Sequence, residues 1–163
     1  MTLTGWRVAR RRFCEAPHAP FDGVGASLHG GRWNSPKTLA AYASSTRSLA
    51  TLEYLAHIDR DELPTDLIRV SIAFQDSDVE SVNLPYPAEW DALAPSTAAQ
   101  QVGDLWLRQQ RTLALAVPSV IVPSERNYVI NPKHRRMATV KISSLEPYVL
   151  DPRLLIRSPE DGE

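Results

Sequence analysis

The sequence predicts an α+β fold in a single domain. Strand-like and helix-like segments are mixed along the chain without the regular alternation of a doubly wound sheet. Residues 67–74 are rich in β-branched side chains and form the clearest strand. Two other segments carry helix-start signals, one after residue 44 and one at Thr97. The 163 residues suit one domain, with an ordered core expected over roughly 5–155.

The first third is predicted to form a strand, a loop, a short strand and a helix. Residues 5–10 alternate bulky and charged side chains, which is typical of a strand. Residues 15–31 hold prolines and glycines and are predicted as a loop. Residues 38–43 are small and apolar, as in a buried strand. The hydroxyls of residues 44–46 then offer N-caps for a helix that runs to about His57.

In that helix, Glu53 lies beside the apolar face rather than on it. The apolar side chains recur at helical spacing and are Leu49, Leu52, Leu55 and Ala56. A carboxylate next to such a face needs a partner, and Arg32 is the candidate. His57 follows Glu53 by four residues, but no third ligand is convincing, so no metal site is expected.

The middle of the chain is predicted to contain a turn, a long connection and a second helix. The polar turn covers 75–78, and the connection of 79–95 is predicted to be extended at the surface. Thr97 and Gln100 have the spacing of a capping box. The helix that follows is predicted to bury Ala99, Val102, Leu105 and Trp106, with a weak ion pair between Asp104 and Arg108.

The last third is predicted to be mostly β-structure. A turn is expected at 123–126, and residues from Ile156 onward are expected to be frayed. The predicted strands are 113–117, 120–122, 127–132, 138–142 and 148–150.

The composition excludes several classes of protein. A net charge of −1 argues against a whole-surface grip on nucleic acid. Cys14 is the single cysteine, so a disulfide or a cysteine-based zinc site is not expected. No apolar run is long enough to span a bilayer, and the early arginines interrupt any signal peptide. These features favour a protein of the cytoplasm.

Three residues are the main candidates for chemistry, and each also has a plain structural interpretation. Arg32 follows two glycines and is either an anion clamp or a surface arginine. Tyr42 either stacks on a planar ring or fills the core. Glu53 is either a reacting carboxylate or a satisfied helix residue. No Walker loop, Gly-x-Gly-x-x-Gly motif or Gly-x-Ser-x-Gly elbow is present.

The other candidates favour structural interpretations when judged from spacing alone. Ser119 follows a proline at a strand end, which is typical of a turn serine or a cap. Cys14 is expected to be a small buried hydrophobe. The loop histidines and the basic patch at 133–136 are expected to be solvated at the surface. The histidines concerned are His18, His29 and His134.

Taken together, the motifs resemble the RES domain family over nearly the whole chain, from Trp6 to about Leu150. The matching residues are Gly30-Gly-Arg-Trp-Asn34, Tyr42, Leu52-Glu53, Val117-Pro-Ser119 and Asn127-Tyr-Val-Ile-Asn-Pro132. The resemblance implies a fold similar to ADP-ribosyltransferases. That fold has a mixed β core of two small sheets, surrounding helices and an NAD cleft between the sheets.

The resemblance also implies a function. Members of the family are typically toxins of bacterial toxin–antitoxin pairs, with an Xre-type helix-turn-helix antitoxin as partner. The chain would deplete NAD⁺, as substrate rather than cofactor, by hydrolysis or phosphorolysis of the nicotinamide–ribose bond. The alternative is a toxin that ADP-ribosylates a protein through the same site. No direct contact with nucleic acid or a membrane is implied, and a homodimer within the toxin–antitoxin complex is compatible with the family.

The roles of individual residues follow from the same resemblance. Glu53 would be the catalytic carboxylate, and Ser119 would line the site and orient Glu53 or the ribose. Arg32 would hold the pyrophosphate or ribose, while Tyr42 would stack on nicotinamide. Two further contacts to NAD are assigned to Arg7 and Asn127. A competing hypothesis without catalysis is a binding module in which Arg32 and Glu53 form a structural ion pair.

Overall fold

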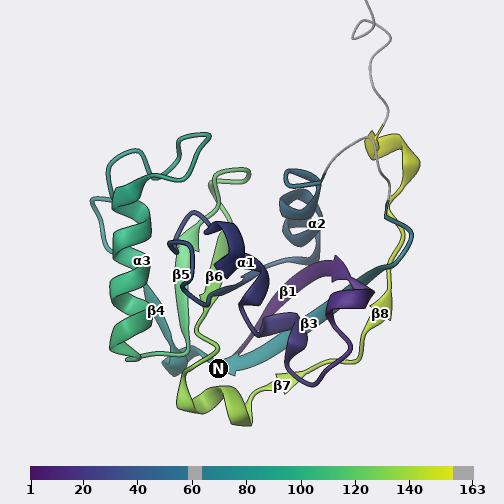
Figure 1. Cartoon of the computed structure of the whole chain (residues 1–163), viewed down its shortest axis with the longest axis horizontal. Helices are drawn as coiled ribbons and strands as arrows, with labels where there is room; N and C mark the ends of the chain where they lie inside the picture. The colour runs from purple at the N-terminus through teal and green to yellow at the C-terminus, as the bar shows by residue number, and fades with distance from the viewer. Residues whose placement is uncertain (59–63, 156–163) are drawn as a thin grey trace, which may run out of the picture.

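The computed structural model describes residues 1–58 and 64–155, whose strands form one sheet (Figure 1). The strand order is β4-β5-β6-β2-β1-β3-β7, and β8 also pairs with β3. Only β4 and β5 are parallel among these pairs. The strands are β1 (Thr2–Arg10), β2 (Ala41–Ser44), β3 (Leu67–Gln75), β4 (Val79–Ser81), β5 (Ala114–Pro118), β6 (Arg126–Ile130), β7 (Lys141–Ile142) and β8 (Glu146–Pro147).

Two of the three described α-helices pack on one face of this sheet. The helices are α1 (Val24–His29), α2 (Arg47–Leu55) and α3 (Thr97–Gln109). Figure 1 shows α3 alongside β5 and β4, and α2 beyond the end of β1. The core under α3 contains Trp33, Ala99, Trp106, Leu107, Leu115, Val117 and Val129. The core under α2 contains Val8, Ala50, Leu67 and Leu150.

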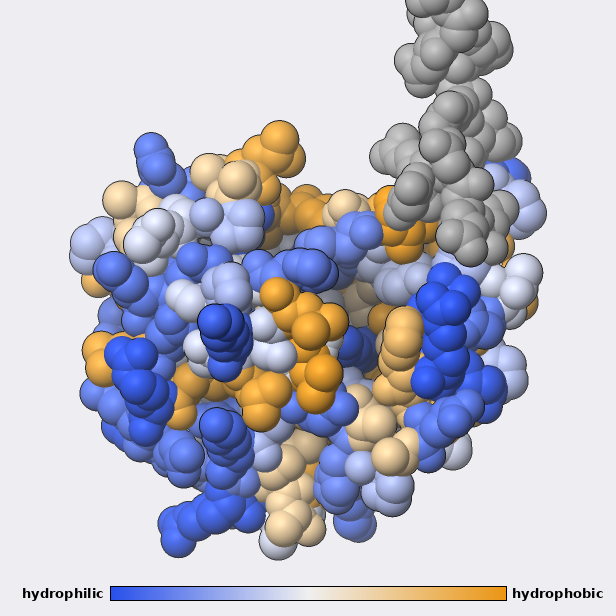
Figure 2. Space-filling view, in the orientation of Figure 1, coloured by the Kyte–Doolittle hydropathy of each residue, from blue (hydrophilic) through white to orange (hydrophobic). Residues whose placement is uncertain are grey.

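The other face of the sheet carries the larger apolar cluster. Alternate residues of β3 supply its Ile68, Val70, Ile72 and Phe74. Phe21 and Met137 cover them from the segments that precede α1 and follow β6. Figure 2 shows a short hydrophobic stripe near the centre of this view, over α1, where Val24 and Leu28 are 50% and 66% exposed.

The α+β class is confirmed, and so are its clearest elements. Strand 67–74 is β3, and the helix expected after residue 44 is α2. Thr46 is its N-cap, because its hydroxyl accepts a hydrogen bond from the backbone nitrogen of Leu49 at 3.1 Å. The strands that the resemblance divides between two small sheets are joined here in one hydrogen-bonded sheet. No helix in the described ranges has the length and apolarity to cross a membrane.

The predicted capping box of α3 is wrong, and its apolar stripe is confirmed only at Ala99 and Trp106, which are buried. Ser96 is the N-cap, and its hydroxyl accepts from the nitrogen of Ala99 at 3.2 Å. Val102 and Leu105 are 37% and 50% exposed. The helix instead buries Gly103, Asp104 and Leu107, because Gly103 packs directly on the backbone of residue 33. Asp104 accepts from the nitrogen of Ser35 at 3.0 Å and forms no ion pair with Arg108.

Other differences lie in the loops and the last third. The predicted loop of 15–31 contains α1, and the connection of 79–95 begins with β4. Residues 120–122 form a bend rather than a strand, and Ser119 bonds the backbone there. The predicted strand 138–142 is confirmed only at β7, which follows a 3₁₀ turn at Arg135–Thr139. The strand predicted at 148–150 is absent there, and β8 lies just before it. Residues from 156 lie outside the described part.

His134 is buried, contrary to the prediction of a surface histidine. It is only 6% exposed, and burial lowers its pKa. Its Nδ1 accepts from the backbone nitrogen of Arg136 at 3.3 Å, so the ring caps a turn. His18 and His29 are exposed as predicted, and Cys14 is buried as predicted.

Candidate active site

The fold carries Glu53 to the end of the sheet where β5 stops and β6 begins. Helix α2 is anchored through Leu49 and Ala50, both buried. Glu53 follows Leu49 by four residues, so the two share one side of the helix. The Glu53 side chain is half-buried and meets groups from the β5–β6 end of the sheet.

One carboxylate oxygen of Glu53 accepts two hydrogen bonds. The Ser119 hydroxyl donates to Oε1 at 3.0 Å, and Nδ2 of Asn127 donates to the same oxygen at 2.5 Å. Among the described residues, Oε2 has no hydrogen bond and Glu53 has no ion pair. Within the described part of the chain, the carboxylate is therefore fixed through one oxygen alone.

The hydroxyl of Ser119 has only one proton, and the surrounding backbone determines where it goes. Ser119 is fully buried just beyond Pro118, the last residue of β5. Its Oγ accepts from the backbone nitrogens of Ile121 and Val122, both at 3.1 Å. With its lone pairs used in this turn, the hydroxyl donates to Glu53. Ser119 therefore both stabilises the turn that the sequence predicted and makes the contact with Glu53 that the resemblance implied.

Asn127 reaches Glu53 from β6, and its neighbour on β2 orients it. Asn127 is opposite Ser44 in the β2–β6 register. The Ser44 hydroxyl donates to Oδ1 of Asn127 at 2.8 Å. A carboxylate can only accept, so the amide must turn Nδ2 toward Glu53 and Oδ1 toward Ser44.

Tyr42 lies on the same face of β2 as Ser44, about 7 Å along the strand. Its hydroxyl donates to Oδ1 of Asn34 at 2.7 Å and accepts from the backbone nitrogen of Trp33 at 3.1 Å. Burial raises the pKa of the Tyr42 phenol above its usual value, and this outweighs the opposing effect of the nearby Arg32 charge. Tyr42 is therefore a neutral, fixed aromatic group at the edge of the core under α3.

Arg32 is bound to the connection between β4 and α3. Its Nη1 donates to the carbonyls of Trp90 and Ala92, each at 2.7 Å. The ring of Trp90 lies against Trp33 and Tyr86, with centroid distances of 6.4 and 5.0 Å. Within the described residues, Nε and Nη2 of Arg32 make no hydrogen bond. The expected partnership of Arg32 with the Glu53 carboxylate is wrong, because each is held by other groups.

Arg7 lies on the opposite face of the sheet from this group. Its alternate neighbours in β1 are Gly5, which packs against Ala43, and Ala9, which belongs to the larger apolar cluster. Burial lowers the pKa of Arg7, and the nearest charged influences are Cys14 and Asp22. The structure therefore does not bring Arg7 to Glu53.

Of the predicted site residues, the structure joins Glu53, Ser119 and Asn127 by direct hydrogen bonds. Tyr42 shares their face of the sheet, and Arg32 belongs to the turn that Tyr42 holds. Sequence analysis missed Ser44, Asn34 and Trp90. Asn34 stood in the glycine-arginine motif and Ser44 among the cap hydroxyls, but neither had a pattern that indicated its partner.

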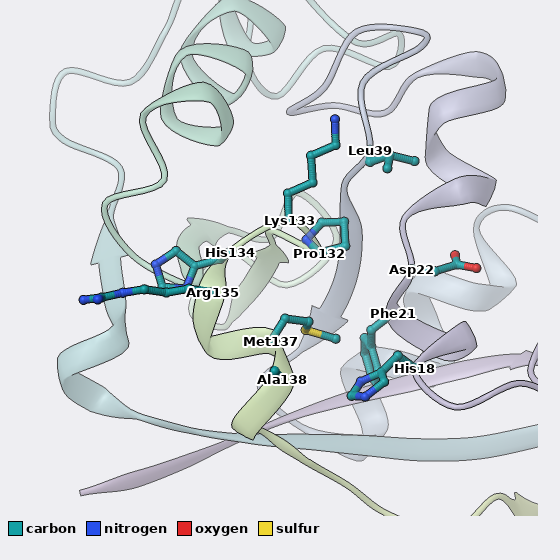
Figure 3. Close-up of a pocket in the computed structure, with 10 residues that line it drawn as sticks. All are labelled: His18, Phe21, Asp22, Leu39, Pro132, Lys133, His134, Arg135, Met137 and Ala138. Carbon is teal, nitrogen blue, oxygen red and sulfur yellow. The ribbon is translucent and has the colours of Figure 1, made fainter.

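Glu53 lines neither of the two described cavities, and no metal site is found among the described residues. The described residues hold no cluster of metal-ligating side chains, and Nδ1 of His57 bonds the backbone carbonyl of Glu53 at 2.7 Å. The larger cavity has a volume of about 560 Å³ and lies by Phe21 and Met137, on the other face (Figure 3). The second, of about 430 Å³, is lined in part by Cys14 and Val140.

The chain is similar in sequence to known proteins over most of its length. The model of the RES domain family matches residues 4–151. A protein of Sphingobium sp. (strain YBL2) named Prs ADP-ribosylating toxin is 36% identical over 160 residues, which are 95% of this chain and 98% of that protein. A protein named Toxin Res, from Photorhabdus laumondii subsp. laumondii, is 36% identical over 141 residues, 83% of this chain and 88% of that protein.

A solved structure shows the same fold at low sequence identity. It is the crystal structure of the M. tuberculosis MbcT–MbcA toxin–antitoxin complex, which the chain matches with a TM-score of 0.69 and 17% identity. The match covers 95% of this chain and 87% of that chain.

Proposed function

Because the chain belongs to the RES domain family, we propose that it is the toxin of a toxin–antitoxin pair and depletes NAD⁺ by cleaving the nicotinamide–ribose bond. The relatives named Toxin Res and the toxin–antitoxin structure of similar fold support the first part. The arrangement around Glu53 supports the second part, and that single observation carries the proposed chemistry.

The carboxylate of Glu53 has the properties that this cleavage needs. Nicotinamide departs from NAD⁺ as a neutral molecule, so the leaving group needs no acid. The ribose develops an oxocarbenium-like charge, which a fixed carboxylate stabilises electrostatically. Ser119 and Asn127 hold Oε1, and Oε2 is left for the ribose or the incoming nucleophile. In the hydrolytic reaction, water adds to the anomeric carbon, and nicotinamide, ADP-ribose and one proton are released.

Arg32 and Tyr42 are suited to binding parts of NAD⁺ that do not react. With Nη1 fixed on two carbonyls, Nε and Nη2 of Arg32 form an edge that matches two phosphate oxygens. The Tyr42 ring is fixed by hydrogen bonds at its hydroxyl and is suited to stacking on nicotinamide. Their binding energy would position the ribose at Glu53. Asn127 and Ser119 would act on Glu53, and a role for Arg7 needs a separate test.

The decisive test is nicotinamide release by the purified chain, freed of any antitoxin. We expect stoichiometric nicotinamide and ADP-ribose in water, with ADP-ribose 1-phosphate in its place if phosphate is the acceptor. Measuring products with and without phosphate separates hydrolysis from phosphorolysis. NAD⁺ that stays intact under both conditions would remove the proposal.

Protein ADP-ribosylation is the second candidate function. The name of the Sphingobium relative, Prs ADP-ribosylating toxin, favours it. The same carboxylate would then stabilise the ribose cation while a protein side chain attacks. With NAD⁺ labelled in its adenylate part and a bacterial lysate, label should become bound to a protein in amounts that match nicotinamide release. Free ADP-ribose in those amounts would instead identify a glycohydrolase.

We propose an antitoxin protein of the Xre type as the partner, in the cytoplasm. The toxin–antitoxin complex of similar fold supports a protein partner. If a helix-turn-helix protein is encoded beside this chain, its co-expression should restore growth of a host that the chain alone inhibits. The mass of the purified complex would report whether the toxin is present as a dimer.

A further inference from the structure

Ser44 has a buried hydroxyl that bonds Asn127, and Asn127 in turn bonds Glu53, the candidate catalytic carboxylate. Ser44 is 4% exposed at the end of β2, and it donates to Oδ1 of Asn127 at 2.8 Å. Asn127 in turn donates to Oε1 of Glu53 at 2.5 Å. The chain of hydrogen bonds thus runs from strand β2 through strand β6 to helix α2.

We propose that Ser44 is a positioning residue that sets the orientation of the Asn127 amide and, through it, the Glu53 carboxylate. An amide can present either its oxygen or its nitrogen to a neighbour after a half-turn of its end. With its oxygen toward Glu53, Asn127 would repel the carboxylate. The Ser44 proton bonds Oδ1 and thereby favours the orientation that donates Nδ2 to Glu53.

The surrounding backbone leaves Ser44 in a fixed place. Ser44 is in register with Asn127 on one side and with Trp6 of β1 on the other. Ser45 follows, and its backbone nitrogen donates to the carbonyl of Arg126, the first residue of β6, at 2.9 Å. Because the strand holds Ser44 in place, the Ser44 hydroxyl can fix the orientation of the longer Asn127 side chain.

This inference rests on the proposed function, since it takes Glu53 as the reacting carboxylate. For Ser44→Ala we expect kcat for nicotinamide release to fall about tenfold, the loss of one hydrogen bond from the site. KM for NAD⁺ and the melting temperature should change little, because Ser44 does not touch the ligand. The matched control is Ser48→Ala, which removes an exposed hydroxyl of α2 and should keep kcat near wild type.

A double-mutant cycle tests whether Ser44 acts through Asn127. In an Asn127→Ala background, Ser44→Ala should have no further effect on kcat, because the amide that it orients is gone. Independent effects that multiply would overturn the inference, as would an unchanged kcat in Ser44→Ala alone. Ser44→Thr keeps the hydroxyl and should recover most of the lost rate.

The outcomes separate this inference from the function on which it rests. A wild-type chain that releases no nicotinamide overturns both. An active wild type with an additive cycle overturns only the role of Ser44. If Ser44→Ala lowers the melting temperature in step with kcat while Ser44→Thr recovers neither, Ser44 is merely structural and the inference is again overturned.

Discussion

The hydroxyl of Ser119 donates a hydrogen bond to the carboxylate of Glu53 at 3.0 Å, across 66 positions of sequence. Ser119 follows Pro118, the last residue of strand β5, and Glu53 lies in the last turn of α2. The contact therefore closes only when the helix is seated on the sheet. Four testable predictions follow from this arrangement and from the contacts of Arg32, Tyr42 and Gly103.

Replacing Glu53 by Gln should lower nicotinamide release at least about 100-fold, because the neutral amide cannot stabilise the ribose cation. The amide keeps the size of the side chain, so circular dichroism and the melting temperature should stay close to wild type. The rate is measured by chromatography of nicotinamide. A Glu53→Gln variant with wild-type turnover would exclude Glu53 as the reacting group.

Replacing Arg32 by Ala should raise KM for NAD⁺ about 10- to 100-fold, because charged hydrogen bonds to phosphate are lost. The connection that holds Trp90 should also become more accessible to protease, since two carbonyls lose their donor. Arg108→Ala is the matched control, an exposed arginine on α3. Equal KM values for the two variants would show that Arg32 serves only the connection.

Tyr42 should make the stability of the protein decrease at alkaline pH. Its pKa in the folded state is raised above the ordinary 10.0 by burial, so the folded chain keeps a proton that the unfolded chain loses. This part of the unfolding free energy is fully present below pH 10 and is lost as pH rises through the folded pKa. Urea unfolding of wild type and Tyr42→Phe from about pH 8 to about pH 11 measures it.

The phenylalanine variant should show the shallower decline. Tyr54 and Tyr128 also have pKa values raised by burial, but they are present in both proteins and cancel in the comparison. Equal slopes in the two proteins would mean that Tyr42 ionises as freely in the folded chain as in the unfolded chain.

Gly103→Ala should destabilise the protein by about 3 kcal/mol or more, because a helix must move away from its neighbour. An added Cβ would lie 1.8 Å from the carbonyl oxygen of Trp33. Gly25→Ala is the control, since a Cβ there meets nothing within 4 Å. In that helix we expect the free energy of unfolding to be unchanged or higher by up to about 1 kcal/mol. Both are measured by urea unfolding.

The sequence predicts the elements that local chemistry determines and misses those that depend on tertiary contact. Strand β3 follows from its β-branched residues, and α2 follows from its cap at Thr46. The burial of Gly103, Asp104 and Leu107 on α3 does not, because it is set by the close approach of Gly103 to Trp33. Because glycine has no side chain, the spacing of hydrophobic residues does not reveal that Gly103 is buried.

The candidate site divides in the same way. The resemblance to the RES domain family drew attention to Glu53, Ser119 and Asn127, and the structure joins them directly. The partner of Arg32 was misjudged, because backbone carbonyls of the connection between β4 and α3 carry no signal in the sequence. Ser44 was interpreted as a cap hydroxyl, and only strand register shows that it faces Asn127.

The hydrogen bond between Thr46 and Glu125, at 2.6 Å, ties the start of α2 to the turn between β5 and β6. Thr46 therefore both caps the start of α2 and attaches the helix to the turn beside Ser119 and Asn127. If this tether loosens on warming, the carboxylate and its donors drift apart while every helix and strand is still intact. On heating, the proposed nicotinamide release should thus be lost some degrees below the temperature at which circular dichroism reports unfolding.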